Sequence, residues 1–344
     1  MLVSTTGLSL AVATSAVNVL MDVCRKKALY RRDLITTTFW MRLFAFFLIS
    51  CGFVYRLCVE GVPAIHDCGP VFGLFGAAWP PLTKFLLYMA VDSSLIAALQ
   101  FFYLSALQSA DLSLCSPFLA FTPVLLIPVG YLLLRELPTQ GQMLGVILVL
   151  CGSLLMNRGA FRISLLEPLK EIFRQRGSRY MLICAFIFAV TNPLDKVIVQ
   201  MSNPATYGLC YGLMLVLIYA GLSFSCRNSV VMPKGKASAW VVCAGVLDGL
   251  CLLLQFAAYR YLDVFVTVTI KRAGVILSVL AGWLIFREKN IANRVVVACV
   301  MLVGVVLITT SMSLAVQYGL ALLMLALLAV WLRLTRFRGD EAGA

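Results

Sequence analysis

Charged side chains are scarce in this sequence: Asp, Glu, Lys and Arg make up 12% of its 344 residues, whereas 62% are hydrophobic. Soluble globular domains carry about a quarter charged residues and about half apolar ones, so the composition excludes an ordinary soluble domain. Disordered and collagen-like chains are excluded as well. The mean hydropathy is +0.97, and long continuous apolar runs are typical of membrane-spanning helices of about 20 residues. We expect an all-α polytopic membrane protein with room for roughly ten helices.

Histidine occurs once, at His66, which excludes a histidine-rich metal site. The twelve cysteines stand singly, mostly within apolar runs, as small buried hydrophobes do. Cys58 and Cys68 are the two cysteines that share a hydrophilic segment. A disulfide between them is possible if that segment faces an oxidising compartment. The sequence has no phosphate-binding glycine loop, no Ser-His-Asp set and no nucleotide-binding domain. We therefore expect no cofactor, no metal, no enzymatic activity and no ATP-driven pumping.

The formal net charge is +13, yet the basic residues lie in short segments between apolar runs. The positive-inside rule explains such residues, so we expect a lipid bilayer and no nucleic acid as the partner. Their distribution over alternate loops favours an N-terminus outside and, with eleven spans, a C-terminus inside. The inside group comprises Arg25, Lys26, Lys27, Arg31, Arg32, Arg158, Arg162, Lys170, Arg174, Arg176, Arg179, Arg227, Lys234, Lys236, Arg287, Lys289, Arg294, Arg333, Arg336 and Arg338.

The apolar runs predict helices at 3–22, 34–55, 83–107, 112–134, 140–157, 180–200, 205–225, 237–258, 262–286 and 291–311. A further run within 313–334 is long enough to form an eleventh transmembrane helix, or it continues the tenth. Segment 162–178 is compatible with a short interfacial helix or with a solvated basic loop.

The two halves of the chain repeat each other. Gly130–Glu136 (GYLLLRE) recurs as Gly282–Glu288 (GWLIFRE), and Leu-Gln-Phe at 99–101 recurs at 254–256. Asp92 and Asp248 precede these glutamines by eight and seven residues, and Asn18 with Asp22 is echoed by Asn192 with Asp195. We predict a first five-helix repeat at 3–157, a basic connecting loop at 158–179, a second repeat at 180–311 and an extra helix at 313–334. An odd number of helices per repeat inverts the second repeat, and inverted repeats of secondary transporters hold the substrate site between them.

The arrangement resembles the drug/metabolite transporter superfamily, specifically proteins with two EamA domains. The shared motif is an apolar helix that ends in Arg135-Glu136 or Arg287-Glu288, followed by a polar turn and a helix containing Gly152 or Gly304. The pair Lys271-Arg272 is similar to the basic pair of sugar-phosphate and nucleotide-sugar translocators, and that likeness implies contact with an anionic substrate. The extra C-terminal segment and the outside N-terminus depart from a ten-helix pattern with both ends inside.

Lys271 and Arg272 fall near the middle of the predicted helix 262–286. An ionisable group costs several kcal/mol there unless it is paired or faces water, so both are candidate substrate ligands. One arrangement has Arg272 binding an anion bidentately and Lys271 acting as a point charge. The alternative is that they neutralise Asp92, Asp195 or Asp248 inside the bundle.

The other candidates are polar residues within the apolar runs. Asp92 and Asp248 are partners for the basic pair or proton-coupling carboxylates, and Asp92 also fits a plain interfacial position. Gln100 and Gln255 donate hydrogen bonds to substrate or lock helices together. Arg42 snorkels to the interface or lines a cavity.

Further polar and proline residues suggest moving parts. The run Asn192-Pro193-Leu194-Asp195-Lys196 is expected to interrupt its helix, with Asp195 and Lys196 gating or pairing with each other. Pro117, Pro123 and Pro128 make the helix at 112–134 a candidate hinge. Glu136 and Glu288, at opposite membrane faces, fit structural ion pairs rather than acid–base catalysis.

The sequence thus predicts a secondary transporter of a small anionic or zwitterionic metabolite, working by alternating access and coupled to a proton or a counter-substrate. The helices at 83–107, 112–134, 237–258 and 262–286 are expected to line its cavity. Alternatives are an exporter of cationic drugs or amines that uses Asp92 and Asp248, and a non-transporting membrane scaffold. We expect a monomer or homodimer in a bacterial plasma membrane.

Overall fold

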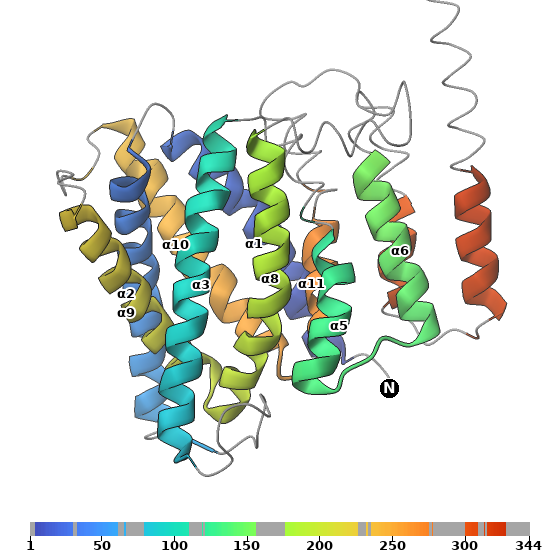
Figure 1. Cartoon of the computed structure of the whole chain (residues 1–344), viewed down its shortest axis with the longest axis horizontal. Coiled ribbons are helices and arrows are strands. Elements are labelled where there is room, and N and C mark those ends of the chain that lie inside the picture. Colours follow the sequence, from blue (N-terminus) through green and yellow to red (C-terminus); the bar gives the residue numbers. More distant parts are fainter. Residues whose placement is uncertain are drawn as a thin grey trace, which may run out of the picture.

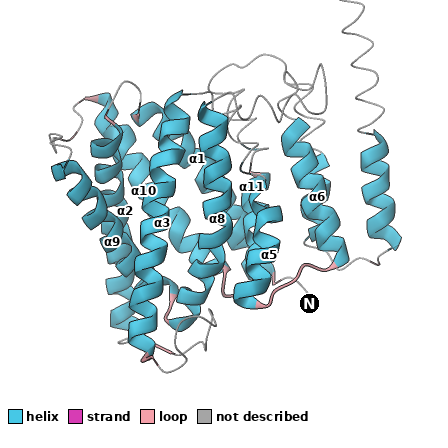
Figure 2. Cartoon of the chain, viewed as in Figure 1, coloured by secondary structure: helices cyan, strands magenta, loops and turns pink. Residues whose placement is uncertain are grey.

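Every regular element that the computed structural model describes is a helix (Figures 1 and 2). The structure describes residues 4–29, 33–60, 65–66, 79–109, 119, 121–155, 176–225, 232, 235–274, 277, 300–308, 313 and 315–327. The labelled helices are α1 (Thr5–Ala28), α2 (Leu34–Glu60), α3 (Pro81–Ser109), α5 (Thr122–Leu134), α6 (Gln140–Leu155), α8 (Arg176–Met201), α9 (Pro204–Ser225), α10 (Lys236–Ala258) and α11 (Val264–Ala273). Residues 300–308 and Ala315–Leu327 are also helical, which makes eleven helices over the described ranges and confirms the all-α polytopic fold.

Six helices are long and apolar enough to cross a bilayer: α1, α2, α3, α8, α9 and α10. Their outward faces carry large apolar side chains, such as Phe47 at 70% exposure and Phe224 at 75%. Many buried positions inside the bundle hold charged or polar side chains instead. A soluble protein has the opposite distribution, so the bundle is built for a lipid surround.

The helices of the two halves pack reciprocally. Helix α1 lies along α10, and α8, its counterpart in the second repeat, lies along α3, the counterpart of α10. Helices α2 and α9, which correspond to each other, pack together at one side of the bundle (Figure 1). Such exchanged pairings are what a pseudo-two-fold relation between repeats produces, so each half completes the other.

Close helix crossings depend on glycine. A Cβ built on Gly245 of α10 would lie 2.5 Å from the carbonyl oxygen of Met41 in α2, and one on Gly249 would lie 2.9 Å from that of Ala45. Gly145 of α6 and Gly304 approach each other's carbonyl oxygens in the same way. Small residues four apart let membrane helices meet backbone to backbone, which compensates for the weak hydrophobic drive within lipid.

Two helix predictions were wrong. Helix α1 continues six residues beyond its predicted end at residue 22, to Ala28. Arg25, Lys26 and Lys27 are therefore helical rather than loop residues. Helix α8 passes through Pro193 without interruption, and the side chain of Asn192 donates to the carbonyl of Phe188 in the turn before the proline.

The run after residue 313 forms a helix of its own. Ser313 is not helical, and Ala315–Leu327 packs through Ala321 against Leu148 of α6 and against Val300 and Leu307. Several expectations fall outside the described residues: the Cys58–Cys68 disulfide, segment 162–175, Pro117, the end of the helix predicted at 262–286, and Arg287-Glu288.

Candidate substrate cavity between the repeats

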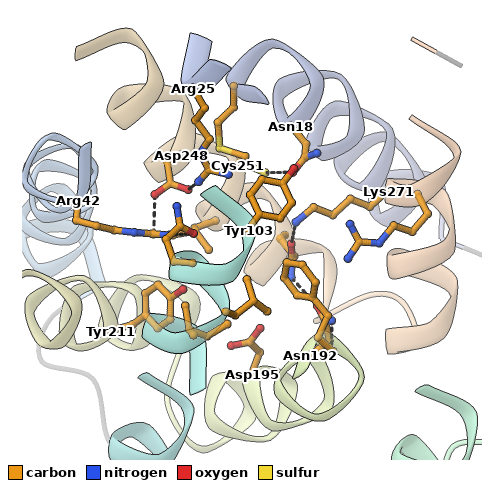
Figure 3. Close-up of a pocket in the computed structure, with 18 residues that line it drawn as sticks. Asn18, Arg25, Arg42, Tyr103, Asn192, Asp195, Tyr211, Asp248, Cys251 and Lys271 are labelled. Atoms are coloured by element: carbon orange, nitrogen blue, oxygen red, sulfur yellow. Dashed lines mark hydrogen bonds and ion pairs between the residues drawn. The ribbon is translucent and has the colours of Figure 1, made fainter. Parts of the chain in front are cut away.

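A small cavity of about 60 Å³ lies among α1, α2 and α3 of the first repeat and α8, α9, α10 and α11 of the second (Figure 3). Helix α5 (Thr122–Leu134) contributes no lining residue, whereas most of segment 112–121, which belongs to the same predicted helix, lies outside the described residues. The polar lining residues are Asn18, Arg25, Arg42, Gln100, Tyr103, Asn192, Asp195, Tyr211, Asp248, Gln255, Lys271 and Arg272.

Asp248 of α10 neutralises two arginines at one end of the cavity. Its Oδ1 lies 2.7 Å from an Nη of Arg25 in α1, and its Oδ2 lies 2.6 Å from an Nη of Arg42 in α2. Arg42 also donates a 2.7 Å hydrogen bond to Oε1 of Gln100 in α3. All four side chains are buried. The position of Arg42 therefore matches the cavity wall rather than snorkelling to an interface.

Lys271 and Arg272 of α11 supply the other cations. Lys271 donates a 2.6 Å hydrogen bond from Nζ to Oε1 of Gln255, and the guanidinium of Arg272 lies 4.6 Å from the centre of the Phe188 ring. Neither has a carboxylate within 4.0 Å among the residues that the structure describes, and Nε of Arg272 has no hydrogen-bond partner there. Neutralisation of Lys271 or Arg272 by direct ion pairing with Asp92, Asp195 or Asp248 is thus not seen among these residues, whereas Lys271 acts on Asp195 electrostatically over a longer distance.

Gln255 is held in one orientation by its neighbours. Its Nε2 donates to the hydroxyl of Tyr259 over 2.7 Å and to Oδ1 of Asn192 over 3.2 Å, and the Tyr259 hydroxyl donates to the same oxygen. Gln255 must therefore present its oxygen to Lys271. The amide fixes the position of the ammonium group without neutralising its charge.

Asp195 also belongs to a polar cluster with Asp92 and Tyr207, which extends away from the cavity. The hydroxyl of Tyr207 in α9 is 2.7 Å from Oδ2 of Asp92 in α3 and 2.5 Å from Oδ1 of Asp195 in α8. Asp195 lines the cavity, whereas Asp92 and Tyr207 do not. The side chain of Asp92 is fully buried among the helices of the bundle.

Lys196 is also absent from the cavity lining. It forms an ion pair with Glu136, just beyond α5, and donates a 3.0 Å hydrogen bond to the carbonyl of Leu262. Glu136 in turn accepts from the backbone N–H of Val264, at the start of α11, over 3.1 Å. Lys196 therefore pairs with Glu136 and not with its neighbour Asp195. The ion-pair role expected of Glu136 is confirmed, and it ties α5, α8 and α11 together.

Eight of the ten candidate residues meet in the cavity; the two exceptions are Asp92 and Lys196. Sequence reasoning missed Arg25, Tyr103, Tyr207 and Tyr211. Arg25 was assigned to a loop, although Asn18, Asp22 and Arg25 are spaced to lie on one face of a longer helix. No group of three or more His, Cys, Asp or Glu residues in the described parts of the chain is arranged to hold a metal.

Secondary transporters hold their substrates in this kind of place, between two structural repeats near the middle of a helical bundle. The model of the EamA-like transporter family matches residues 5–158 and 175–310. The chain belongs to the EamA-like transporter family and is thus a membrane transporter of the drug/metabolite superfamily.

Twenty-nine chains of solved structures match this protein. One of them, described as "Crystal structure of protein", has a TM-score of 0.61 and 16% sequence identity, and the match covers 88% of this chain and 95% of that one. At this identity the likeness shows the fold alone. A search of curated proteins finds no match.

Proposed function

We propose that this protein is a secondary transporter that moves a small anionic or zwitterionic metabolite by alternating access. The observation that carries the proposal is the pair Lys271 and Arg272, which bring two positive charges to a buried cavity and meet no carboxylate among the described residues. A buried charge without a counter-ion is costly, so an anionic ligand between the repeats would stabilise both the pair and itself.

The balance of charge in the lining supports an anion. Four cationic side chains (Arg25, Arg42, Lys271 and Arg272) face two anionic ones (Asp195 and Asp248). Asp248 is saturated by two arginines. The excess positive charge therefore belongs to Lys271 and Arg272, whose ammonium and guanidinium groups suit carboxylate or phosphate oxygens.

Asp195 extends the proposal to zwitterions. It lies in the same cavity as Lys271 and has no Lys or Arg within 4.0 Å among the described residues. An amino group of the substrate that faced Asp195, while its acidic group faced Lys271, would satisfy both. A purely cationic substrate is less well served, because Asp248 is already paired and Asp92 is outside the lining.

The size of the cavity supports a mechanism in which it must open. A volume of about 60 Å³ is far below the roughly 300 Å³ or more of a metabolite site, so binding requires the helices to separate. The ion pair between Lys196 and Glu136 fastens α8 to the end of α5 and to the start of α11. We propose that this contact breaks and re-forms as the cavity opens, with Pro128 inside α5 as a hinge.

We further propose that the N-terminus lies outside and that the C-terminus lies inside, in a bacterial plasma membrane. Lys26 and Lys27 lie in the last turn of α1, where the positive-inside rule expects basic residues at the inner end of a helix. Labelling of single cysteines, placed at residue 4 and at residue 344, with a membrane-impermeant reagent tests the two ends separately.

The substrate class is tested by ligand-dependent thermal stability of the purified protein in detergent. The panel holds a dicarboxylate (succinate), a sugar phosphate (glucose 6-phosphate), an amino acid (glutamate) and a quaternary amine (choline). A ligand at a hundred times its dissociation constant adds about 2.7 kcal/mol. We expect stabilisation by an anion or zwitterion, which is lost in Lys271→Met/Arg272→Met and kept in Lys27→Met, whose charge lies over Trp240 away from the cavity.

Stabilisation by choline alone would move the site to the aspartates and contradict the proposal. A non-transporting scaffold would be favoured by a different result: no compound stabilises the protein, and the double variant is as stable as wild type. Apolar replacement of a buried charged pair can leave the stability of a scaffold unchanged.

A further inference from the structure

Two pairs of carboxyl groups that the internal repeat relates lie in and next to the cavity, and one member of each pair, Asp248 or Asp195, lines it. Asp22 of α1 and Asp248 of α10 form the first pair, and Asp195 of α8 and Asp92 of α3 form the second. Asp22 corresponds to Asp195 and Asp248 corresponds to Asp92, so the two pairs occupy equivalent places in the α1–α10 and α8–α3 contacts. Their neutralisation is nevertheless different.

Arginine neutralises the first pair. Arg25 lies between its two members, 3.6 Å from Oδ1 of Asp22 and 2.7 Å from Oδ1 of Asp248, and Arg42 adds a second positive charge to Asp248. Two carboxylates thus share two guanidinium groups. Asp248, which meets both guanidinium groups, requires no proton to be stable within the bundle.

The second pair has a tyrosine where the first has an arginine. The Tyr207 hydroxyl lies 2.7 Å from Asp92 and 2.5 Å from Asp195, and no Lys or Arg of the described residues lies within 4.0 Å of either carboxyl group. Asp92 and Tyr207 are 0% exposed, and Asp195 is 5% exposed. The Oδ1 atom of Asp92 has no hydrogen-bond partner in the described parts of the chain.

Counting protons shows what this geometry requires. A hydroxyl group carries one proton and donates one hydrogen bond. Since Tyr207 contacts two carboxyl groups, one of the two bonds must be donated by a carboxylic acid to the tyrosine oxygen. Two bare carboxylates around one hydroxyl would also repel each other, with no Lys or Arg of the described residues within 4.0 Å to compensate.

Other ionisable groups around Asp92, Asp195 and Tyr207 influence how readily these two carboxyl groups bind a proton. Lys271 of α11 acts on Asp195, and Tyr259 of α10 interacts with both Asp195 and Asp92. Tyr211 of α9 also lines the cavity, and it lies within electrostatic reach of the same two carboxyl groups, of Arg42 in α2 and of Asp248 in α10. Lys271 is therefore the cation through which an event in the cavity reaches Asp195.

We propose that Asp92 and Asp195 share one proton through Tyr207 and that this proton is the coupling ion of transport, taken up together with an anionic substrate. The proton enters at Asp195, which faces the cavity. Asp195 then donates it to the oxygen of Tyr207 while Tyr207 donates its own proton to Asp92; Asp195 becomes a carboxylate, Tyr207 is unchanged and Asp92 becomes the acid. The reverse transfer returns the proton to the cavity.

The direction of coupling follows from Lys271. While its charge is uncompensated, it favours a carboxylate at Asp195. An anion bound at Lys271 compensates the lysine's positive charge and also repels the carboxylate of Asp195. A proton therefore binds Asp195 more readily. By linkage, protonation then strengthens binding of the anion by the same factor. Proton and anion therefore bind and move together, as in a symporter; this part rests on the proposed function, whereas the shared proton does not.

The test is infrared spectroscopy of the purified protein in detergent with no ligand, following the carbonyl stretch of a protonated carboxylic acid near neutral pH. We expect the band in wild type and in Asp263→Asn, whose side chain is about half exposed at 47%, and its loss in Asp92→Asn and in Asp195→Asn. Aspartate labelled with ¹³C at the carboxyl carbon shifts the band if it arises from an aspartic acid, and the loss of the band in the two Asn variants assigns it to this pair.

The coupling is tested in the same samples. Lys271→Met removes the charge that an anion would compensate, and we expect its acid band to persist to higher pH than that of wild type or Lys27→Met. Absence of an aspartic-acid band from wild type near neutral pH would overturn the shared proton. A band unaffected by Lys271→Met would overturn the coupling. If the band behaves as expected while no anion stabilises the protein, the proposed substrate class fails and the shared proton stands.

Discussion

Lys271 of α11 donates a 2.6 Å hydrogen bond to Gln255 of α10 within the cavity between the repeats. The amide supplies an oxygen and no charge. The ammonium group is therefore positioned but not neutralised, which distinguishes it from Arg25 and Arg42, whose charges meet Asp248. A binding site for an anion needs this combination of fixed geometry and available charge.

Lys271→Met should weaken binding of the anionic ligand found in the stability panel. A hydrogen bond to a charged group contributes about 1.5–3 kcal/mol, which corresponds to roughly ten- to a hundredfold in affinity. Isothermal titration calorimetry of the purified variant measures the change. Affinity equal to that of wild type would remove Lys271 from the site.

Asp248→Asn should destabilise the protein itself. The substitution leaves two buried arginines without their shared carboxylate, and breaking a buried ion pair from one side costs about 3–5 kcal/mol. Thermal unfolding in detergent should show a large drop for Asp248→Asn and little change for Asp263→Asn, whose nearest cation, Lys196, is 3.8 Å away. Equal melting temperatures would show that Asp248 is not the counter-ion of the arginines.

The sequence was sufficient to predict the fold and most of the cavity, because both leave strong local signals. An apolar run of about 20 residues indicates a helix, and a charged residue inside such a run must find a polar interior. Asp248, Lys271 and Arg272 were found in this way. Arg25 was missed because three adjacent basic residues after an apolar run also fit a cytoplasmic loop.

Gly245→Ala should separate α10 from α2. The added Cβ would lie 2.5 Å from the carbonyl oxygen of Met41 and 2.7 Å from Cβ of Phe44, and such overpacking costs about 1–3 kcal/mol. Gly221→Ala in α9 is the matched control, because a Cβ there meets nothing within 4 Å; it should be neutral or stabilise by up to about 1 kcal/mol. Melting temperatures in detergent compare the two variants, and Gly245→Ala should melt below Gly221→Ala. A higher melting temperature for Gly245→Ala would be incompatible with the close crossing of α10 and α2.

Glu136→Gln and Lys196→Met should be strongly non-additive. Glu136 joins Lys196 to the first backbone N–H of α11, and Lys196 also binds the carbonyl of Leu262. Residues within one such network show interaction energies of about 0.5–3 kcal/mol in double-mutant cycles. Unfolding of both single variants and the double variant gives this energy directly. Additive effects would mean that the two side chains do not support each other.

The tyrosines show what the sequence leaves undetermined. Tyr103, Tyr207 and Tyr211 stand in apolar runs where an aromatic residue fits a lipid-facing or core position equally well. Only the packing of α9 against α3 and α8 brings the Tyr207 hydroxyl between two carboxyl groups. Asp92 and Lys196 could not be separated from the cavity residues for the same reason, because their distance from it depends on tertiary contacts.

Exchange across the membrane of reconstituted vesicles tests the central claim most directly. Proteoliposomes are loaded with the unlabelled anionic or zwitterionic compound that stabilises the protein, and uptake of the same compound in radiolabelled form is measured without ATP. The account predicts uptake by wild type and by Lys27→Met, and none above empty vesicles for Lys271→Met/Arg272→Met. Uptake by the double variant at the wild-type rate would contradict it.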